Sequence, residues 1–320
     1  MSDSPSAQAL AVREPVPWRE IEWLSMTPFL AAHLVPFAAM WTGVRPVDVL
    51  VAVVLYVVRM FAVTAGYHRY FAHRTFKTSR LFQFLLAFLA QTSSQRGVLW
   101  WAAHHRVHHK ESDGPGDVHS PVRRGFLYAH VLWIYHRNAE TRTERIKDFA
   151  RYPELRFLDR YWLLPPVVLG LAVFLLFGWS GLVIGFFAST VALWHGTFLI
   201  NSLTHVWGSK RFDAGDESRN NALFALVTLG EGWHNNHHYY QSATRQGFYW
   251  WEVDVTYYVL RMLSLLGIVR DLREPPERVL QLGRRLDAER RAARRARRRG
   301  LQEALDEASA GARPSTDAAA

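Results

Sequence analysis

Residues 161–205 read YWLLPPVVLGLAVFLLFGWSGLVIGFFASTVALWHGTFLINSLTH. Within this segment, residues 161–179 and 181–203 are almost wholly apolar, and each approaches the roughly 20 residues that a helix needs to cross a bilayer. The segment therefore predicts two membrane spans joined by a very short turn. Its end carries Asn201 and His205. These residues are four positions apart and so share one helix face.

Two further apolar runs precede this segment. Residues 26–43 form a short run that is interrupted by Pro28, His33 and Pro36, and residues 47–65 contain a single basic residue, Arg59. A third run, residues 81–90, is too short to cross a hydrocarbon core of roughly 30 Å, and we interpret it as buried or re-entrant. The sequence thus predicts an all-α integral membrane protein with four transmembrane helices.

The distribution of charge predicts the orientation. The loop between the second and third spans, residues 66–160, carries 16 Lys and Arg residues, whereas the connectors between the other spans carry almost no charge. The positive-inside rule places this loop and both termini in the cytoplasm. Arg greatly outnumbers Lys, which suggests a GC-rich bacterial genome and hence a bacterial inner membrane.

The remaining parts of the chain are polar. Residues 1–25 form a cytosolic leader without the features of a signal peptide. Residues 273–320 form a basic tail that we expect to be partly helical and to end in a disordered stretch. The net charge of +10 comes without a nucleic-acid-binding motif, so lipid or an acidic substrate is the expected partner. Because the chain has no Cys, any metal must be bound by nitrogen and oxygen ligands.

Histidines cluster at three places around these spans. The clusters are His68–His73 (HRYFAH), His105–His109 (HRVHH) and His234–His238 (HNNHH). Positions i, i+3 and i+4 lie on one helix face, so the three histidines of each of the last two clusters should point together. His68 and His73 are five apart and converge only if the helix ends or distorts there. The predicted topology places every cluster at the cytoplasmic membrane surface.

Nine convergent imidazoles are too many for one metal ion, so we expect two ions. Imidazole binds iron, zinc, copper and nickel. Zinc has no redox chemistry, and oxygen chemistry on an inert C–H bond requires iron or copper, of which iron is the better choice. An isolated histidine in such a loop is usually structural, but two HxxHH patterns and one HxxxxH pattern together are difficult to explain without a metal.

The three motifs, HRYFAH, HRVHHK and GEGWHNNHH, resemble those of the membrane fatty acyl desaturases, specifically the delta-9 or stearoyl-CoA type. The resemblance covers residues 66–250 and the four-span layout. It implies a helical cytosolic cap over the spans, a di-iron site and O2 as co-substrate. It also implies the ligand set, in which Asn201 acts through water: His68, His73, His105, His108, His109, Asn201, His205, His234, His237 and His238.

The same resemblance sets the expected reaction and domain boundaries. The reaction is the introduction of a cis double bond, at position 9, into a long-chain acyl thioester or acyl lipid. Residues 26–272 would form the membrane desaturase domain. The chain shows no haem-binding domain of the cytochrome b5 kind, so two electrons should come from a separate ferredoxin, cytochrome b5-like protein or reductase. Chain length and acyl carrier (CoA, phospholipid or carrier protein) stay open.

Other residues are weaker candidates. His104, Asp113, Asp117 and Glu231 could support the ligating rings through their second nitrogen, or be ordinary loop residues. Arg123 and Arg124 could bind a phosphorylated head group or only mark topology, and Trp194 and Trp233 could line an acyl tunnel or belong to an aromatic belt. A packing or hydrogen-bonding role is expected for His119, His130, His136 and His195, and no catalytic role is expected for His33 in the first span.

Two alternatives remain at this point. A hydroxylase that acts on acyl chains or alkanes would use the same kind of site, and only its product would differ. A membrane metal transporter or sensor would need ionisable groups deep in its spans. Only His33, Arg59 and His195 qualify, and they form no recognisable pathway in the sequence.

Overall fold

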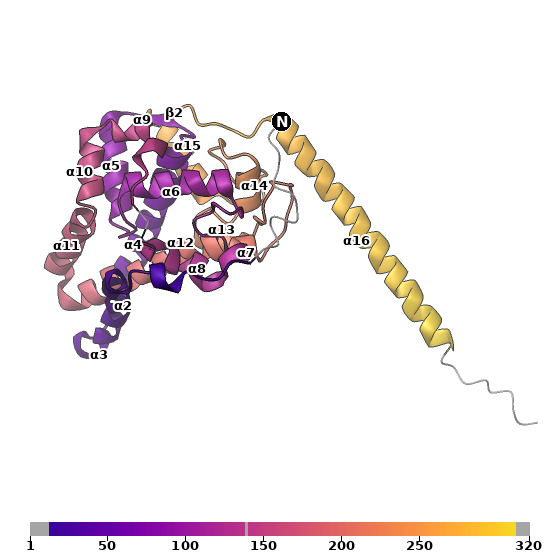
Figure 1. The fold of residues 1–320 in the computed structure, drawn as a ribbon, viewed down its shortest axis with the longest axis horizontal. Helices are drawn as coiled ribbons and strands as arrows, with labels where there is room; N and C mark the ends of the chain where they lie inside the picture. Colours follow the sequence, from indigo (N-terminus) through magenta and orange to yellow (C-terminus); the bar gives the residue numbers. More distant parts are fainter. Residues whose placement is uncertain (1–12, 138–139, 312–320) are drawn as a thin grey trace, which may run out of the picture. The chain divides into compact units, whose positions relative to one another are not determined.

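The computed structural model describes residues 13–137 and 140–311 and is helical almost throughout (Figure 1). The chain divides into two compact units, residues 1–275 and residues 276–320. The first unit contains one small sheet, in which β1 (Lys77–Thr78) pairs antiparallel with β2 (Val269–Arg270). The first part of the leader, residues 1–12, and the expected disordered end, residues 312–320, lie outside the described residues.

Three helical runs are long and apolar enough to cross a bilayer, where the sequence predicted four spans. They are Trp23–Thr42, Pro46–Ala72 and Leu164–His205. The first comprises η2 (Trp23–Met26), α2 (Thr27–Leu34), η3 (Val35–Ala38) and α3 (Ala39–Thr42), after the short helix η1 (Trp18–Glu20). The second comprises α4 (Pro46–Phe61) and the π-helix η4 (Ala62–Ala72).

The third run contains both spans that the sequence predicted between residues 161 and 203. It comprises α11 (Leu164–Ser180), the π-helix η7 (Gly181–Ala188), α12 (Ser189–Ser202) and η8 (Leu203–His205). Gly178 breaks the helix with φ +71° and ψ −162°, a conformation that glycine adopts without a steric penalty. Beyond the kink, Gly170 faces the ring of Phe186 and Gly185 faces Val173, so α11 packs back against η7.

A buried cation joins the membrane helices. The Arg59 guanidinium donates to the hydroxyls of Thr190 at 2.7 Å and Ser189 at 2.5 Å, and its Nε donates to the carbonyl of Leu55. A charge inside the apolar layer is costly unless its donors are satisfied. These bonds tie α4 to the start of α12.

Shorter helices fill the segments between and after the membrane runs. The 66–160 loop contains α5 (Arg80–Gln91), which has a buried face of Gln83, Leu86, Ala87, Ala90 and Gln91. The other helices of this loop are α6 (Val98–Glu111), α7 (Pro121–Arg124), α8 (Phe126–His130), η5 (Leu132–Tyr135), η6 (Thr143–Arg145), α9 (Lys147–Ala150) and α10 (Pro153–Arg160). After the third run come α13 (Ala222–Val227), α14 (His234–Tyr239) and α15 (Val255–Leu265).

The second unit consists of one long helix, α16 (Glu277–Gly311), within the basic tail. Its first half is rich in exposed arginine, and Arg284 and Arg285 form ion pairs with Glu277 and Glu289.

Candidate metal centre

Regular helices bring the two HxxHH motifs together. His105, His108 and His109 lie on α6, and His234, His237 and His238 lie on α14, with spacing that places each set on one face. His205 closes η8 at the end of the third membrane run.

The HxxxxH motif uses a different geometry. Residues 62–72 form a π-helix, in which the backbone bonds run from i to i+5, and the N–H of His73 donates to the carbonyl of His68 at 3.1 Å. Residues five apart therefore lie one above the other, and the two rings are 4.8 Å apart. The distortion that convergence required is thus a π-helix that ends at Ala72.

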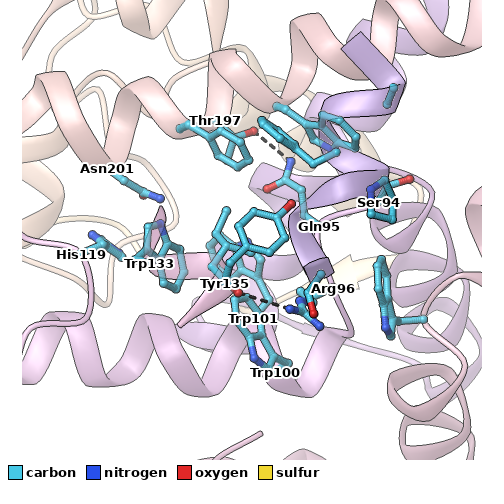
Figure 2. A pocket seen from close by; sticks show the side chains of 18 of the residues that line it. Ser94, Gln95, Arg96, Trp100, Trp101, His119, Trp133, Tyr135, Thr197 and Asn201 are labelled. Atoms are coloured by element: carbon cyan, nitrogen blue, oxygen red, sulfur yellow. Dashed lines mark hydrogen bonds between the residues drawn. The ribbon is translucent and has the colours of Figure 1, made fainter. Parts of the chain in front are cut away.

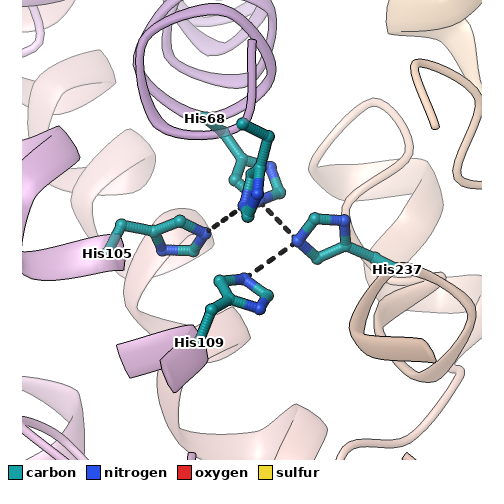
Figure 3. Close-up of side chains that lie close together, drawn as sticks. His68, His105, His109 and His237 are labelled. Carbon is teal, nitrogen blue, oxygen red and sulfur yellow. Dashed lines mark hydrogen bonds between the residues drawn. The ribbon is translucent and has the colours of Figure 1, made fainter. Parts of the chain in front are cut away.

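The nine predicted histidines form two adjacent clusters, which we call cluster A and cluster B. In cluster A, the candidate ligand atoms lie within 4.8 Å of one another; its members are His68, His73, His105, His109 and His237. Cluster B meets the same criterion, and its members are His108, His205, His234 and His238. The His109 and His238 rings, one from each cluster, are 4.3 Å apart. Figure 3 shows four rings of cluster A converging on a common point.

The distances between the nitrogens suit metal ions. The Nε2 atoms of His68 and His237 are 2.9 Å apart, those of His73 and His105 are 2.9 Å apart, and those of His205 and His234 are 3.1 Å apart. Two nitrogens bound at ~2.1 Å to one ion and at right angles to each other would be about 3.0 Å apart. The clusters therefore have the donor type and spacing of two metal sites.

The protonation and hydrogen bonding of the rings fit the same function. Burial lowers the pKa of His73, His105, His109, His234 and His237 well below the usual value, so these rings are neutral, as ligands must be. In cluster B, the Nε2 atoms of His108 and His238 are buried without a hydrogen-bond partner. Such atoms are costly unless something not present in the chain binds them.

Carboxylates hold the outer nitrogen of four of these rings. The distance from Nδ1 to the carboxylate is 2.9 Å for His108 and Asp117, 2.8 Å for His205 and Asp113, and 2.6 Å for His238 and Asp216. Glu231 pairs with Nδ1 of His68. Metal-binding histidines usually donate their second N–H in this way, which fixes the tautomer and turns Nε2 toward the metal. The structure thus brings the predicted acids Asp113, Asp117 and Glu231 to the centre and adds Asp216, which no spacing in the sequence indicates.

A buried ion network supports Glu231. The Arg69 guanidinium is fully buried between Glu231, at 3.1 Å, and Asp254, at 2.9 Å. Gly230 adopts φ +131°, and a Cβ there would lie 2.4 Å from a carboxylate oxygen of Asp254. The glycine before Glu231 is therefore required by this close approach.

The two asparagines of HNNHH orient α14. The Asn235 side-chain oxygen accepts from the backbone N–H groups of Arg211 and Phe212, at 2.7 and 2.8 Å. The Asn236 amide donates to Glu252 at 2.9 Å and to the carbonyl of Gln246 at 3.0 Å. These bonds leave the three histidines of the motif facing the clusters.

His104 does not belong to either cluster. Asn201 lines a neighbouring cavity together with His105 and His119. The Nδ1 atom of His104 contacts the carbonyl of Trp100, within its own helix, so this ring turns away from the ligands. His119, for which a packing role was expected, stacks on His108 at 4.1 Å and forms a third possible ligand group with His108 and Asp117.

The cavity next to the centre has a volume of about 470 Å³ and a largely aromatic wall (Figure 2). Figure 2 shows Asn201 and His119 at one end of it and Arg96 and Ser94 further along. Trp194 lines this cavity, and its indole N–H donates to the carbonyl of Ser93. Trp233 does not line it, and its indole donates to the carbonyl of Val253.

The predicted head-group residues are already paired. Arg123 is buried and pairs with Glu14, and Arg124 pairs with the same carboxylate at 2.9 Å. The sequence could not show this pairing, because Glu14 lies more than 100 residues away in the leader.

Comparison with known proteins identifies the family. Residues 45–264 match the family model described as fatty acid desaturase. The chain belongs to the fatty acid desaturase family. One relative is the sn-1 stearoyl-lipid 9-desaturase of Anabaena variabilis, 36% identical over 79% of this chain and 94% of that protein. Delta-9 acyl-lipid desaturase 2 of Arabidopsis thaliana is 33% identical over 81% of this chain and 85% of that protein. The acyl-CoA C20 delta5-desaturase of Anemone leveillei is 33% identical over 68% of this chain and 71% of that protein.

The predicted family and enzyme class are thereby confirmed. The chain is an oxygen-dependent acyl desaturase, an oxidoreductase of lipid metabolism with apolar helices of membrane-spanning length and a buried, histidine-rich centre. The transporter or sensor alternative does not agree with this family.

Proposed function

We propose that this desaturase introduces a cis double bond at position 9 of a long acyl chain, using O2 and two electrons, at two iron ions held by clusters A and B. The observation that carries the proposal is the aromatic cavity, because its wall includes His105 of cluster A and reaches Asn201. An acyl chain in this cavity would run past the metal centre. The relatives from Anabaena and Arabidopsis, whose names specify position 9, support the regiochemistry.

The ligand assignment follows the clusters. Five rings would hold one iron and four rings the other, and Asn201 would complete one site through water. Two irons bound there would supply the reduction of O2 and the removal of hydrogen from two adjacent methylenes. The chain's own residues would orient the rings, through Asp113, Asp117, Asp216 and Glu231.

The cavity wall would position the substrate and exclude water. Phe29, Trp194 and Phe198 pack against one another with ring centroids 5.2 and 6.3 Å from that of Phe29. Because most of the wall is aromatic or aliphatic, burial of apolar surface would be the main interaction that holds an alkyl chain in place. We propose an acyl lipid as the substrate, with an acyl-CoA as the alternative, since both words occur in the names of the relatives.

The electrons would come from a separate carrier that docks where cluster A is nearest to solvent. A surface hollow of about 330 Å³ is lined by His73 and His109 of cluster A together with Arg106 and Lys110. Arg74, which follows His73 in the sequence, lines a second hollow together with the basic residues Lys77, Arg151, Arg270 and Arg273. A positively charged face would attract an acidic one-electron carrier, such as a ferredoxin or a cytochrome b5-like protein.

We further propose four membrane spans, with the run Leu164–His205 counted as two. Its 42 residues would extend about 63 Å as a straight helix, twice the hydrocarbon thickness of a bilayer. The kink at Gly178 and the packing of α11 on η7 support a hairpin. The metal centre would then lie in a cytosolic cap, with both termini in the cytoplasm of a bacterial inner membrane. Residues 1–25, 26–272 and 273–320 would be the leader, desaturase domain and tail.

Lipid analysis tests this function. The protein is expressed in a host that makes no unsaturated fatty acids, and the acyl chains of its lipids and its acyl-CoA pool are analysed by gas chromatography with mass spectrometry. The proposal predicts a new cis-9 monoene, and its loss in His108→Ala. A hydroxylated product, a double bond elsewhere in the chain, or an unchanged monoene content in His108→Ala would contradict it.

A further inference from the structure

A chain of hydrogen bonds outside the metal centre links three helices. The Nε2 atoms of His33 on α2 and His195 on α12 are 3.0 Å apart. The Nδ1 atom of His195 lies 3.0 Å from Nε2 of His130 on α8. His130 continues the chain through Nδ1 to the hydroxyl of Ser202 at 3.0 Å. The chain ends on a carbonyl at each side, that of Phe29 at 2.7 Å and that of Phe198 at 2.9 Å.

The hydrogen-bond chain has fewer N–H and O–H protons than it has hydrogen-bond contacts. Five contacts run from the Phe29 carbonyl to the Phe198 carbonyl, and each needs one proton. A neutral imidazole supplies one N–H and a serine supplies one O–H, so three rings and one hydroxyl supply four. All five bonds form only when the chain holds one additional proton. In the neutral chain, two lone pairs face each other at one contact.

The surroundings allow this extra charge to be shared but not neutralised. Aromatic rings enclose the chain: Phe29 lies 4.4 Å from the His33 ring and Phe126 stacks on His130 at 5.0 Å. The ionisable groups on the adjoining elements have other partners: Arg59 binds Ser189 and Thr190, Arg123 and Arg124 pair with Glu14, Tyr56 bonds to the Val227 carbonyl, Tyr128 to Arg124, and His205 to Asp113. Among the described residues, no carboxylate contacts the three rings.

The hydrogen-bond chain holds one wall of the acyl cavity in place. Helix α2 and the turn before it contribute Ser25, Pro28, Phe29 and Ala32 to the lining. His33 lies on the same helix, outside the lining, and links it by a hydrogen bond to His195 on α12. Helix α12 supplies Trp194, Thr197 and Phe198 to the same cavity. A change at His33 therefore acts on the cavity through the placement of α2.

We infer that His33, His195 and His130 are positioning residues that share one bound proton and thereby fix α2 as the wall of the acyl cavity. The inference rests on the proposed acyl-binding role of that cavity. Burial lowers the pKa of His130 to about 4, whereas completion of the fifth hydrogen bond favours the charged form. A shared proton is lost as the pH rises, so all five hydrogen bonds should form at low pH and not at high pH.

The test measures acyl binding directly, in the full-length metal-loaded protein. The probe is the fluorescent methyl ester of a parinaroyl chain, whose head group does not titrate. In His33→Ala, we expect binding to weaken about two- to tenfold, the range for loss of one hydrogen bond. His33→Gln retains an amide that can bond to His195 and should stay within about twofold of the wild type. Leu34→Ala, at the neighbouring exposed position, is the matched control and should bind normally.

The pH profile separates a shared proton from simple packing. Wild-type binding should tighten as the pH falls from 7.5 to 5, and this dependence should be absent in His33→Ala. Equal binding by the wild type and His33→Ala, or a pH profile unchanged by the substitution, would overturn the inference. Failure of the wild type to bind the probe at any pH would instead contradict the proposed function. If His33→Ala does not fold, His33→Gln and the wild-type titration decide the matter.

Discussion

Asp216 Oδ2 lies 2.6 Å from Nδ1 of His238, and both side chains are buried. Burial opposes the charge on Asp216, but the His238 ring lowers the pKa of this carboxyl far below the usual range, so it remains ionised. It fixes the proton on Nδ1 and leaves Nε2, which has no partner among the described residues, free to bind a metal.

The first prediction concerns this contact. Asp216→Ala should lower metal affinity about 10- to 100-fold, the usual cost of losing such a partner. Metal retention is measured by elemental analysis after dialysis against a graded chelator. Asp213→Ala is the control, since Asp213 lies in the same loop, is exposed and bonds only to the N–H of Gly215. Equal retention by the two variants would show that Asp216 does not support the site.

The second prediction concerns the glycine before Glu231. Gly230→Ala places a Cβ 2.4 Å from an Asp254 oxygen at φ +131°, which displaces the carboxylate that holds Arg69. We expect a loss of stability of about 1–3 kcal/mol or more, seen as a lower Tm in detergent. Gly215→Ala is the control, because φ is +80° but nothing lies within 4 Å. A similar fall in Tm in both variants would assign the effect to the backbone alone.

The third prediction concerns pH. Burial raises the pKa of the Asp117 carboxyl, but the adjacent His108 lowers it, and the net result is a pKa of about 2, below the usual value for Asp. A carboxyl with a lowered pKa stabilises the fold above its unfolded pKa and loses this effect as the pH falls through the folded value. This contribution, about 2 kcal/mol, should therefore disappear between pH 4 and pH 2. Acid unfolding of Asp117→Asn should depend less steeply on pH over that interval, and an identical slope would contradict the prediction.

The fourth prediction concerns the electron donor. Lys110→Glu reverses a charge at the hollow that reaches His73 and His109. The variant should raise the KM for an acidic ferredoxin and weaken the salt dependence of turnover, because surface attraction governs the encounter. Reduction of the centre by dithionite should be unchanged. Lys210→Glu serves as the control at a site paired with Glu217. An unaltered KM in Lys110→Glu would place the docking site elsewhere.

Local periodicity predicted much of this site. The i, i+3, i+4 spacing of HRVHH and HNNHH required only a regular helix, and α6 and α14 provide it. The pairing of His68 with His73 could not be derived from a regular helix, because it depends on a π-helix whose hydrogen bonds shift by one residue. The role of Asp216 and the pairing of Arg123 with Glu14 depend on contacts distant in sequence. The three-histidine chain was equally hidden, since His33, His130 and His195 follow no common spacing.

The membrane segments were predicted with similar limits. Hydropathy located the apolar runs, but the structure joins the two segments predicted between residues 161 and 203 into one helical run, Leu164–His205, which is kinked at Gly178 with its positive φ. The second span was expected to end at residue 65, whereas the helix continues to Ala72 as η4, which includes His68 of the HRYFAH motif.

The most direct test of the central claim is metal stoichiometry. Protein purified without added chelator is analysed for transition metals by inductively coupled plasma mass spectrometry, and the oxidation state of the iron is followed by Mössbauer spectroscopy. Two clusters of five and four histidines predict two irons per chain, with His73→Ala and His234→Ala each reducing the content from its own cluster. A single ion per chain, or a wild-type protein that is folded yet free of transition metal, would contradict a two-iron centre.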